Sequence, residues 1–153
     1  MEADASVNSR DILGRRALHF AIVARWWYPP IPNLKIACDM WIVERLLCHP
    51  EISLNPVDQV GNTPLMWVVK ERKSDAVKGL FKKGANANIP NINNRTPLQV
   101  ALSSRNPSNH IVSALLTNGA GIYCEDKFRQ IPMDILVRNV RAHETFLFAK
   151  HVW

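Results

Sequence analysis

The chain has 153 residues, a length typical of one domain, and 47% of them are hydrophobic with only 6 glycines, which is compatible with a packed core. No apolar run approaches the roughly 18 to 20 residues of a membrane span, and Met1 to Asp11 is too polar for a secretion signal. Three widely spaced cysteines indicate neither a disulfide framework nor a zinc site. These features predict a soluble intracellular protein, cytoplasmic or nuclear, with no cofactor and no metal.

Positive charge is in excess, and the net charge of +6 raises the question of an acidic partner. The excess is 0 over residues 1–57, +3 over 58–90, +1 over 91–125 and +2 over 126–153. Lys78, Lys82 and Lys83 fall on one predicted helix, where a solvated face explains them. The charge is therefore spread along the chain rather than gathered in one basic region.

The chain begins with Met1 to Asp11, which we expect to be a mobile polar arm. Leu13 to Ala21 then matches Val60 to Val68 further along the chain. The match predicts that the same local structure occurs in both places.

An insertion follows this first match. Gly14 and Gly61 are 47 positions apart, against a spacing of 33 further along, and most of the extra residues lie between Arg25 and Lys35. Three prolines in four residues forbid a continuous helix there. Trp26 and Trp27 either form a binding hot spot on a protruding loop or fold back over the first turn and shield it.

The next predicted element is a helix from Asp39 to His49, which carries apolar residues at spacings of three and four on one face. A complete helix-turn-helix unit follows from Asp58 to Pro90. Thr63 can cap its first helix, and Pro64 occupies the first helical position, where a missing N–H costs nothing. Gly84 ends the second helix because glycine accepts left-handed backbone angles.

The second helix of this unit, Asp75 to Lys83, contains a glycine. Gly79 costs about 1 kcal/mol in helix propensity relative to alanine. The gap that it leaves is expected to admit a bulky neighbour such as Trp67.

The same unit recurs twice more. A shift of 33 places Thr63-Pro64-Leu65 on Thr96-Pro97-Leu98, within the unit 91–125. Asn94 takes a glycine position there, and asparagine tolerates left-handed angles. A further shift of 35 reaches Ile131-Pro132, within the unit 126–153, whose second helix is predicted from Ala142 to His151.

This repeated pattern resembles the ankyrin repeat, in which D-x-x-G-x-T-P-L-H-x-A opens a unit and G-A-D-x-N closes it. Residues at the matching positions are Asp58, Gly61, Thr63, Pro64, Leu65, Gly84, Ala85 and Asn88. The resemblance implies an all-α solenoid of stacked helix-turn-helix units with projecting loops or β-hairpin fingers. It covers the whole chain as one domain, with repeats at about 11–57, 58–90, 91–125 and 126–153.

Catalytic and metal-binding patterns are not found. The five histidines lack metal-ligand spacing, and Ser103-Ser104 has no base and orienting acid within its unit. His19 falls on the histidine of the ankyrin pattern, which implies that it ties neighbouring turns together by hydrogen bonds. The chain is therefore not expected to be an enzyme.

The resemblance implies instead that partners are bound by the loop before each first helix and by the exposed side of that helix. Carried over residue by residue, these positions are Leu13, Arg15, Gln59, Val60, Asn62, Lys70, Glu71, Ile92, Asn93, Arg95, Ser103, Ser104, Lys127, Phe128, Gln130 and Arg138, to which the insertion adds Trp26 and Trp27.

Val60, Ile92 and Phe128 are predicted to share one position in successive units. They either line up as an apolar strip with a polar rim or each pack against their own loop.

The resemblance also implies a modification, because an asparaginyl hydroxylase acts on the ankyrin position at which Asn88 stands. Leu80 fits that preference, whereas Asn86 replaces the usual acid.

The chain is expected to be a monomeric protein-binding module, such as an adaptor, scaffold, inhibitor or effector, with a protein rather than nucleic acid or a membrane as its partner. Two alternatives remain open. One is a module that binds nucleic acid or an anionic ligand, and the other is a regulatory subunit of a separate enzyme.

Overall fold

The computed structural model describes residues 6–23 and 38–139, and all regular structure within these ranges is helical. The all-α prediction is thus confirmed. The chain divides into two compact units, Met1–Asn86, hereafter unit 1, and Ala87–Trp153, hereafter unit 2.

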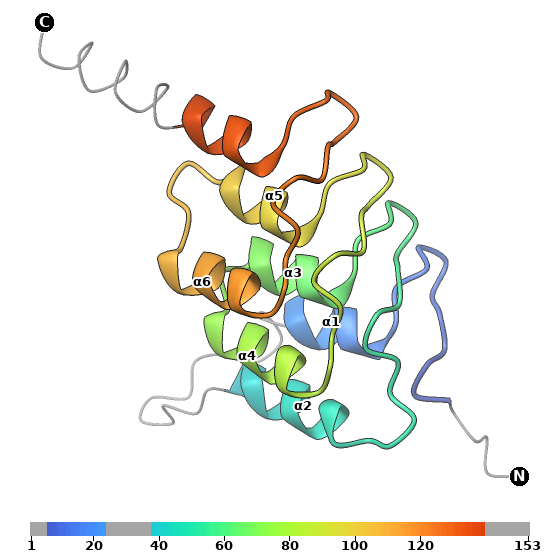
Figure 1. Cartoon of the computed structure of the whole chain (residues 1–153). Helices are drawn as coiled ribbons and strands as arrows, with labels where there is room; N and C mark the ends of the chain where they lie inside the picture. The colour runs from blue at the N-terminus through green and yellow to red at the C-terminus, as the bar shows by residue number, and fades with distance from the viewer. Residues whose placement is uncertain (1–5, 24–37, 140–153) are drawn as a thin grey trace, which may run out of the picture. The chain divides into compact units, whose positions relative to one another are not determined.

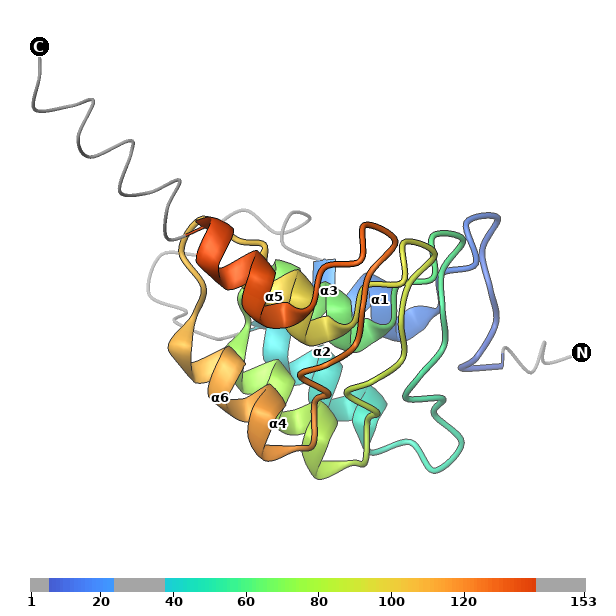
Figure 2. The same cartoon turned by 45° about the horizontal axis from the view of Figure 1, so that its top comes forward.

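The described residues of unit 1 contain four helices in two rows. They are α1 (Ala17–Val23), α2 (Cys38–Leu47), α3 (Pro64–Lys70) and α4 (Ser74–Lys82). Helices α1 and α3 pack against each other as the inner row, and α2 and α4 pack against each other and against them as the outer row (Figure 1). The loops before α1 and α3 project on the same side of the unit (Figure 2).

Single residues explain where α3 begins and why the helical conformation does not continue past α4. Thr63 caps α3, since its Oγ1 accepts the N–H of Met66 at 3.3 Å, and Pro64 is the first helical residue, as predicted. Gly84 follows α4 with a φ of +95°, a left-handed angle that glycine adopts without strain.

The core of unit 1 lies between its two rows of helices. The fully buried apolar side chains come from all four helices: Leu18, Ile22, Val43, Leu65, Met66, Val68, Ala76, Val77 and Leu80. Burial of one such large side chain contributes roughly 1.5 to 3 kcal/mol. Apolar packing between the helices therefore holds the two rows together. The projecting loops are not needed for this core.

Unit 2 repeats the arrangement. Helix α5 (Pro97–Leu102) packs against α6 (Asn109–Thr117), and residues 132–139 form a further helical segment beside α5 (Figure 1). Leu98, Ile111, Leu115 and Ile135 are buried at no more than 2% exposure. The apolar positions of unit 1 thus recur as the core of unit 2.

Two expectations about unit 1 were wrong. Residues 6–11 are not a free arm, because the Asn8 side chain accepts the N–H of Ser53 at 2.8 Å and donates to the carbonyl of Glu51 at 2.6 Å. The space beside Gly79 faces α2 rather than Trp67, since a Cβ added there would meet Leu47 Cδ1 at 3.5 Å. Trp26, Trp27 and the helix expected from Ala142 to His151 lie outside the described residues.

Candidate functional site

Each inner helix is preceded by a five-residue turn, hereafter a finger, and the described ranges contain four of them: 11–15, 58–62, 91–95 and 126–130. In the finger 58–62, Asp58 Oδ1 accepts the N–H of Val60 at 3.0 Å and that of Asn62 at 2.8 Å. The first residues of the other fingers, Asp11, Asn91 and Asp126, accept the same two bonds. Bonds of this kind close a turn from within, so each finger keeps its shape through its own first side chain.

The fourth residue of every finger has a left-handed backbone. The φ angles are +71° at Gly14, +75° at Gly61, +56° at Asn94 and +57° at Arg129. Glycine and asparagine accept this angle readily, as predicted for Asn94. For an arginine the same angle costs roughly 1 kcal/mol or more of conformational free energy. The last finger thus keeps a basic residue at a strained position.

The two fingers of unit 1 are tied to each other. The N–H of Gln59 donates to the carbonyl of Leu13 at 2.9 Å, and the Gln59 side chain donates to the carbonyl of Ile12. The apolar side chains at these tips remain in solvent, with exposed fractions of 90% for Ile12, 42% for Leu13 and 47% for Val60. Unit 1 therefore displays an apolar finger edge.

Asn62 does not belong to that displayed edge, so its prediction as a contact residue is corrected. Its side chain is 4% exposed and donates to Asp58 Oδ2 at 3.4 Å, while its carbonyl faces His19. The indole N–H of Trp67 donates to the same carboxylate oxygen at 3.0 Å. This part of the finger serves the packing of the unit.

Arg15 lies beside the base of the first finger. Its Nη2 is 2.7 Å from Asp11 Oδ2, and its guanidinium stands 4.5 Å from the centre of the half-exposed Phe20 ring. Loss of water on its own raises the pKa of Asp11, but hydrogen bonds from Arg15 and the Leu13 N–H lower it below its ordinary value. Among the other predicted contacts of unit 1, Lys70 is exposed and Glu71 half-buried at the end of α3.

His19 ties two turns of unit 1 together, which confirms the structural role expected of it. Its Nδ1 accepts the N–H of Arg16 at 3.1 Å, so Nε2 carries the proton that it shares with the carbonyl of Asn62 at 3.2 Å. Burial lowers the pKa of His19, and the nearby Asn62 carbonyl and Asp58 carboxylate oppose this only in part. The imidazole is therefore kept neutral as a bridge between turns.

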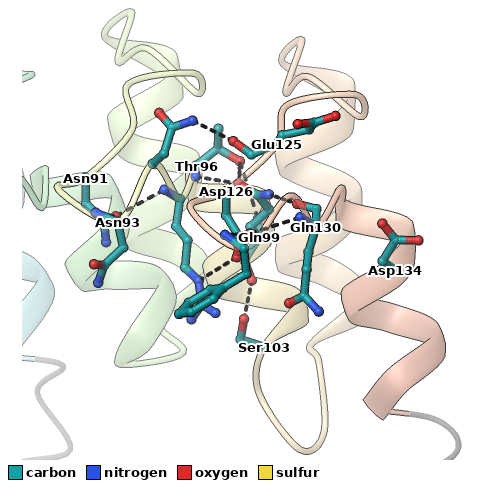
Figure 3. Close-up of polar contacts among 12 residues, drawn as sticks. Asn91, Asn93, Thr96, Gln99, Ser103, Glu125, Asp126, Gln130 and Asp134 are labelled. Carbon is teal, nitrogen blue, oxygen red and sulfur yellow. Dashed lines mark hydrogen bonds and ion pairs between the residues drawn. The ribbon is translucent and has the colours of Figure 1, made fainter.

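In unit 2, Gln99 connects two turns by hydrogen bonds, as His19 does in unit 1. Its side-chain oxygen accepts the N–H of Thr96 at 2.9 Å, and its nitrogen donates to the carbonyls of Cys124 at 2.9 Å and Gln130 at 2.8 Å (Figure 3). The side chain is fully buried. The sequence analysis did not predict this role, although Gln99 aligns with His19 as the third residue of its inner helix and that alignment would have indicated it.

The two fingers of unit 2 are joined as those of unit 1 are, with the N–H of Lys127 donating to the carbonyl of Asn93 at 3.0 Å. Arg95 Nε lies 3.2 Å from Asp126 Oδ2, and its guanidinium stands 5.9 Å from the centre of the Phe128 ring. Burial on its own raises the pKa of Asp126, but the N–H groups of Gln130 and Phe128 and the Arg95 side chain lower it. Phe128 itself is 71% exposed.

The prediction that Val60, Ile92 and Phe128 share one position was wrong. Val60, Asn93 and Phe128 each donate their N–H to the first side chain of their finger, which makes them third residues. Ile92 is a second residue, the place that Lys127 holds in its finger. Ile92 is nevertheless 52% exposed.

The remaining predicted contacts of unit 2 divide between structural and displayed groups. Ser103 Oγ donates to the carbonyl of Gln99 at 2.7 Å, and the carbonyl of Ser104 accepts from Asn139 at 3.3 Å. Arg138 is exposed, and its Nη1 donates to Gln130 Oε1 at 3.1 Å. Gln130 and Arg138 are thus brought together, whereas the Ser103 side chain bonds to the backbone of its own helix and Ser104 contributes its carbonyl to a bond from Asn139.

Asn88 belongs to a set of asparagines that bridge consecutive loops. Its side chain donates to the carbonyl of Gly119 at 2.8 Å and accepts the N–H of Gly121 at 2.7 Å. Asn55 accepts the N–H of Asn86 at 2.9 Å in the same way within unit 1. Hydroxylation of Asn88 stays a prediction.

The described residues contain no group of three or more His, Cys, Asp or Glu side chains that could hold a metal ion. In the same ranges no helix is long and apolar enough to cross a membrane.

Comparison with known proteins gives a family match. A family model for ankyrin repeats in three copies matches residues 34–126. Human palmitoyltransferase ZDHHC13 is 36% identical over 78 residues, which cover 50% of this chain and 12% of that protein. The human transient receptor potential cation channel subfamily A member 1 is 38% identical over 63 residues, 41% of this chain and 6% of the channel.

A putative ankyrin repeat protein of Rickettsia bellii is 30% identical over 95 residues, 62% of this chain and 46% of that protein. The chain thus spans less than half the length of each of these relatives.

Proposed function

This chain belongs to the ankyrin-repeat family, whose repeats are generally protein–protein interaction modules, and on that premise we propose that it is a non-enzymatic module that binds a protein partner through its fingers and the exposed side of its inner helices.

The observation that carries this proposal is the division of labour within each finger. The first side chain closes the turn, while the second and third side chains stand in solvent even where they are apolar. Val60 and Phe128 are 47% and 71% exposed, so neither is packed away against its own finger. Exposed apolar side chains on a turn that is stabilised from within suit contact with another protein.

The test removes these side chains without touching the turns. The double variant Val60→Ala and Phe128→Ala should change the free energy of unfolding by less than about 0.5 kcal/mol, because both side chains are exposed. Capture of partner proteins from a cell extract by the immobilised chain should fall by about tenfold or more, as expected for hot-spot side chains.

A matched control removes exposed apolar side chains elsewhere. Ile42 on α2 and Leu116 on α6 are 40% and 45% exposed, and both lie on second helices rather than on fingers. Alanine at these two positions should leave capture unchanged. Equal losses in both double variants, or marked unfolding of the finger variant, would reject the proposed surface.

A further inference from the structure

We infer that the last finger of unit 2 recognises an acidic peptide segment that carries an aromatic side chain, an inference that rests on the proposed function and names the chemistry of its partner. The surface consists of Lys127, Phe128, Arg129 and Arg138, hereafter the basic finger surface. Its residues are all exposed.

Two of the carboxylates near this surface in sequence, Asp126 and Asp134, accept hydrogen bonds from the chain itself. Asp126 accepts the N–H groups of Phe128 and Gln130 and pairs with Arg95. Asp134 Oδ2 accepts the N–H of Ile131 at 3.0 Å at the start of the helical residues 132–139. Figure 3 shows Asp126, Glu125 and Asp134 near the last finger. Within the described residues, neither Asp134 nor the exposed Glu125 forms an ion pair with Lys127, Arg129 or Arg138.

The cations of the surface retain their charge toward solvent. Arg138 bonds to the side-chain oxygen of Gln130, which is a neutral acceptor, and has no ion pair among the residues that the structure describes. Arg129 holds its exposed side chain at a φ of +57°, where the other fingers have glycine or asparagine. A basic residue at a strained and exposed position contributes nothing evident to the turn, so its charge fits a ligand of opposite sign.

Phe128 supplies an apolar platform among these cations. Its ring is 71% exposed and has the Arg95 guanidinium 5.9 Å from its centre, while Arg95 is neutralised by Asp126. Phe128 has Lys127 and Arg129 as its chain neighbours in the finger, and Arg138 bonds to Gln130 of the same finger. An acidic segment with an aromatic side chain is complementary to both parts of this surface.

A peptide fits this surface better than a nucleic acid does. Duplex-binding proteins neutralise on the order of six to ten phosphates, whereas the basic finger surface offers Lys127, Arg129 and Arg138. Its central side chain is a largely exposed aromatic ring, which is common at protein interfaces.

The test measures binding of dye-labelled peptides to the intact chain by fluorescence anisotropy. The probe alternates glutamate with glycine around one phenylalanine, and two matched peptides replace either every glutamate by glutamine or the phenylalanine by serine. We expect the original probe to bind best and to weaken as salt rises, because exposed charges are screened.

The variant Lys127→Gln with Arg129→Asn removes two charges and keeps a residue that accepts the left-handed angle. It should weaken probe binding by roughly three- to tenfold, as expected for two exposed ion pairs. The control variant Lys78→Gln, Lys82→Gln and Lys83→Gln removes three exposed charges from α4 and the residue that follows it in unit 1. It should change binding by less than about twofold, because those charges belong to a second helix rather than to a finger and exposed charges are screened by salt.

Three outcomes would overturn the inference: equal binding of the glutamine peptide, an equal loss in the α4 variant, or tighter binding of a single-stranded oligonucleotide that depends on Lys127 and Arg129. The proposed function is judged separately. If the Val60 and Phe128 double variant loses its protein partner while the Lys127 and Arg129 variant keeps it, the inference fails and the proposed function stands.

Discussion

The two units place different side chains at the same point of the inner helix, His19 in unit 1 and Gln99 in unit 2. Each accepts a backbone N–H at the start of its own helix and bonds to a carbonyl of the next finger, Asn62 or Gln130. Helices α1 and α5 both have there a flat side chain with an acceptor at one end and a donor at the other, whereas α3 has Met66 at this place. The difference is that imidazole titrates near neutral pH and an amide does not.

The fingers differ as well. Unit 1 displays the apolar tips Ile12, Leu13 and Val60, whereas the last finger of unit 2 displays Phe128 among cations. Their turns are closed by the same hydrogen bonds. The scaffold is therefore shared, and the second and third residues of each finger determine the chemistry that it displays.

The largest expected effect comes from breaking the bridge in unit 2. Gln99→Leu removes the side-chain partners of the Thr96 N–H and the Cys124 carbonyl and leaves the Gln130 carbonyl with the N–H of Asp126 alone, which should cost roughly 3 kcal/mol of unfolding free energy. Gln99→His, which copies unit 1, should cost less than half as much. Urea unfolding followed by circular dichroism measures both, and equal losses would show that the place needs the amide itself.

A smaller effect is expected at the closing residue of the last finger. Asp126→Ala removes the acceptor of the Phe128 and Gln130 N–H groups and should cost about 2 kcal/mol. Asp126→Asn should cost about half of that, because Asn91 already closes the neighbouring finger with an amide. The same unfolding measurement applies, and a fully destabilised asparagine variant would mean that the pair with Arg95 dominates.

Because His19 titrates, the free energy of unfolding should depend on pH through this residue of unit 1. The pKa of His19 is lowered from its ordinary value of 6.5, so the unfolded chain binds this proton more readily than the folded chain. Its contribution is fully present above pH 6.5 and is lost as the pH falls through the lower folded value. Asp11 and Asp126, whose pKa values are lowered from 3.8, act in a separate and more acidic window.

The variant His19→Gln, which copies unit 2, should flatten this dependence between roughly pH 5 and 7. Thermal melts across that range measure it. A variant profile as steep as that of the parent would exclude His19 as the source.

The smallest expected effect concerns the second helices of the two units, α4 and α6. Gly79 in α4 occupies the place that Ala114 holds in α6, and a Cβ there would meet Leu47 at an ordinary contact distance of 3.5 Å. Gly79→Ala should therefore raise the free energy of unfolding by about 0.5 to 1 kcal/mol. A loss measured by urea unfolding would mean that α2 and α4 cannot accommodate the methyl group.

The helix starts could be predicted because their signals are local. Thr63 and Thr96 bond to backbone N–H groups three residues away, and a proline follows each. The role of Asn8 could not be predicted, since its partners Ser53 and Glu51 lie more than forty residues away in the sequence. The register of Ile92 was misjudged although the shift of 33 places Val60 on Asn93, and the bonds to Asn91 show that Asn93 is the third residue of its finger.

The sequence by itself determined the helical units, their caps and turns, and membership of the ankyrin-repeat family, because repeated spacing and capping act over a few residues. Only the tertiary structure decided which polar side chains are buried and bonded within the protein and which are exposed to solvent. Asn62, Gln99 and Asp126 are of the buried kind. Burial and hydrogen bonding at these places depend on neighbours that are distant in the chain, and no local pattern records them.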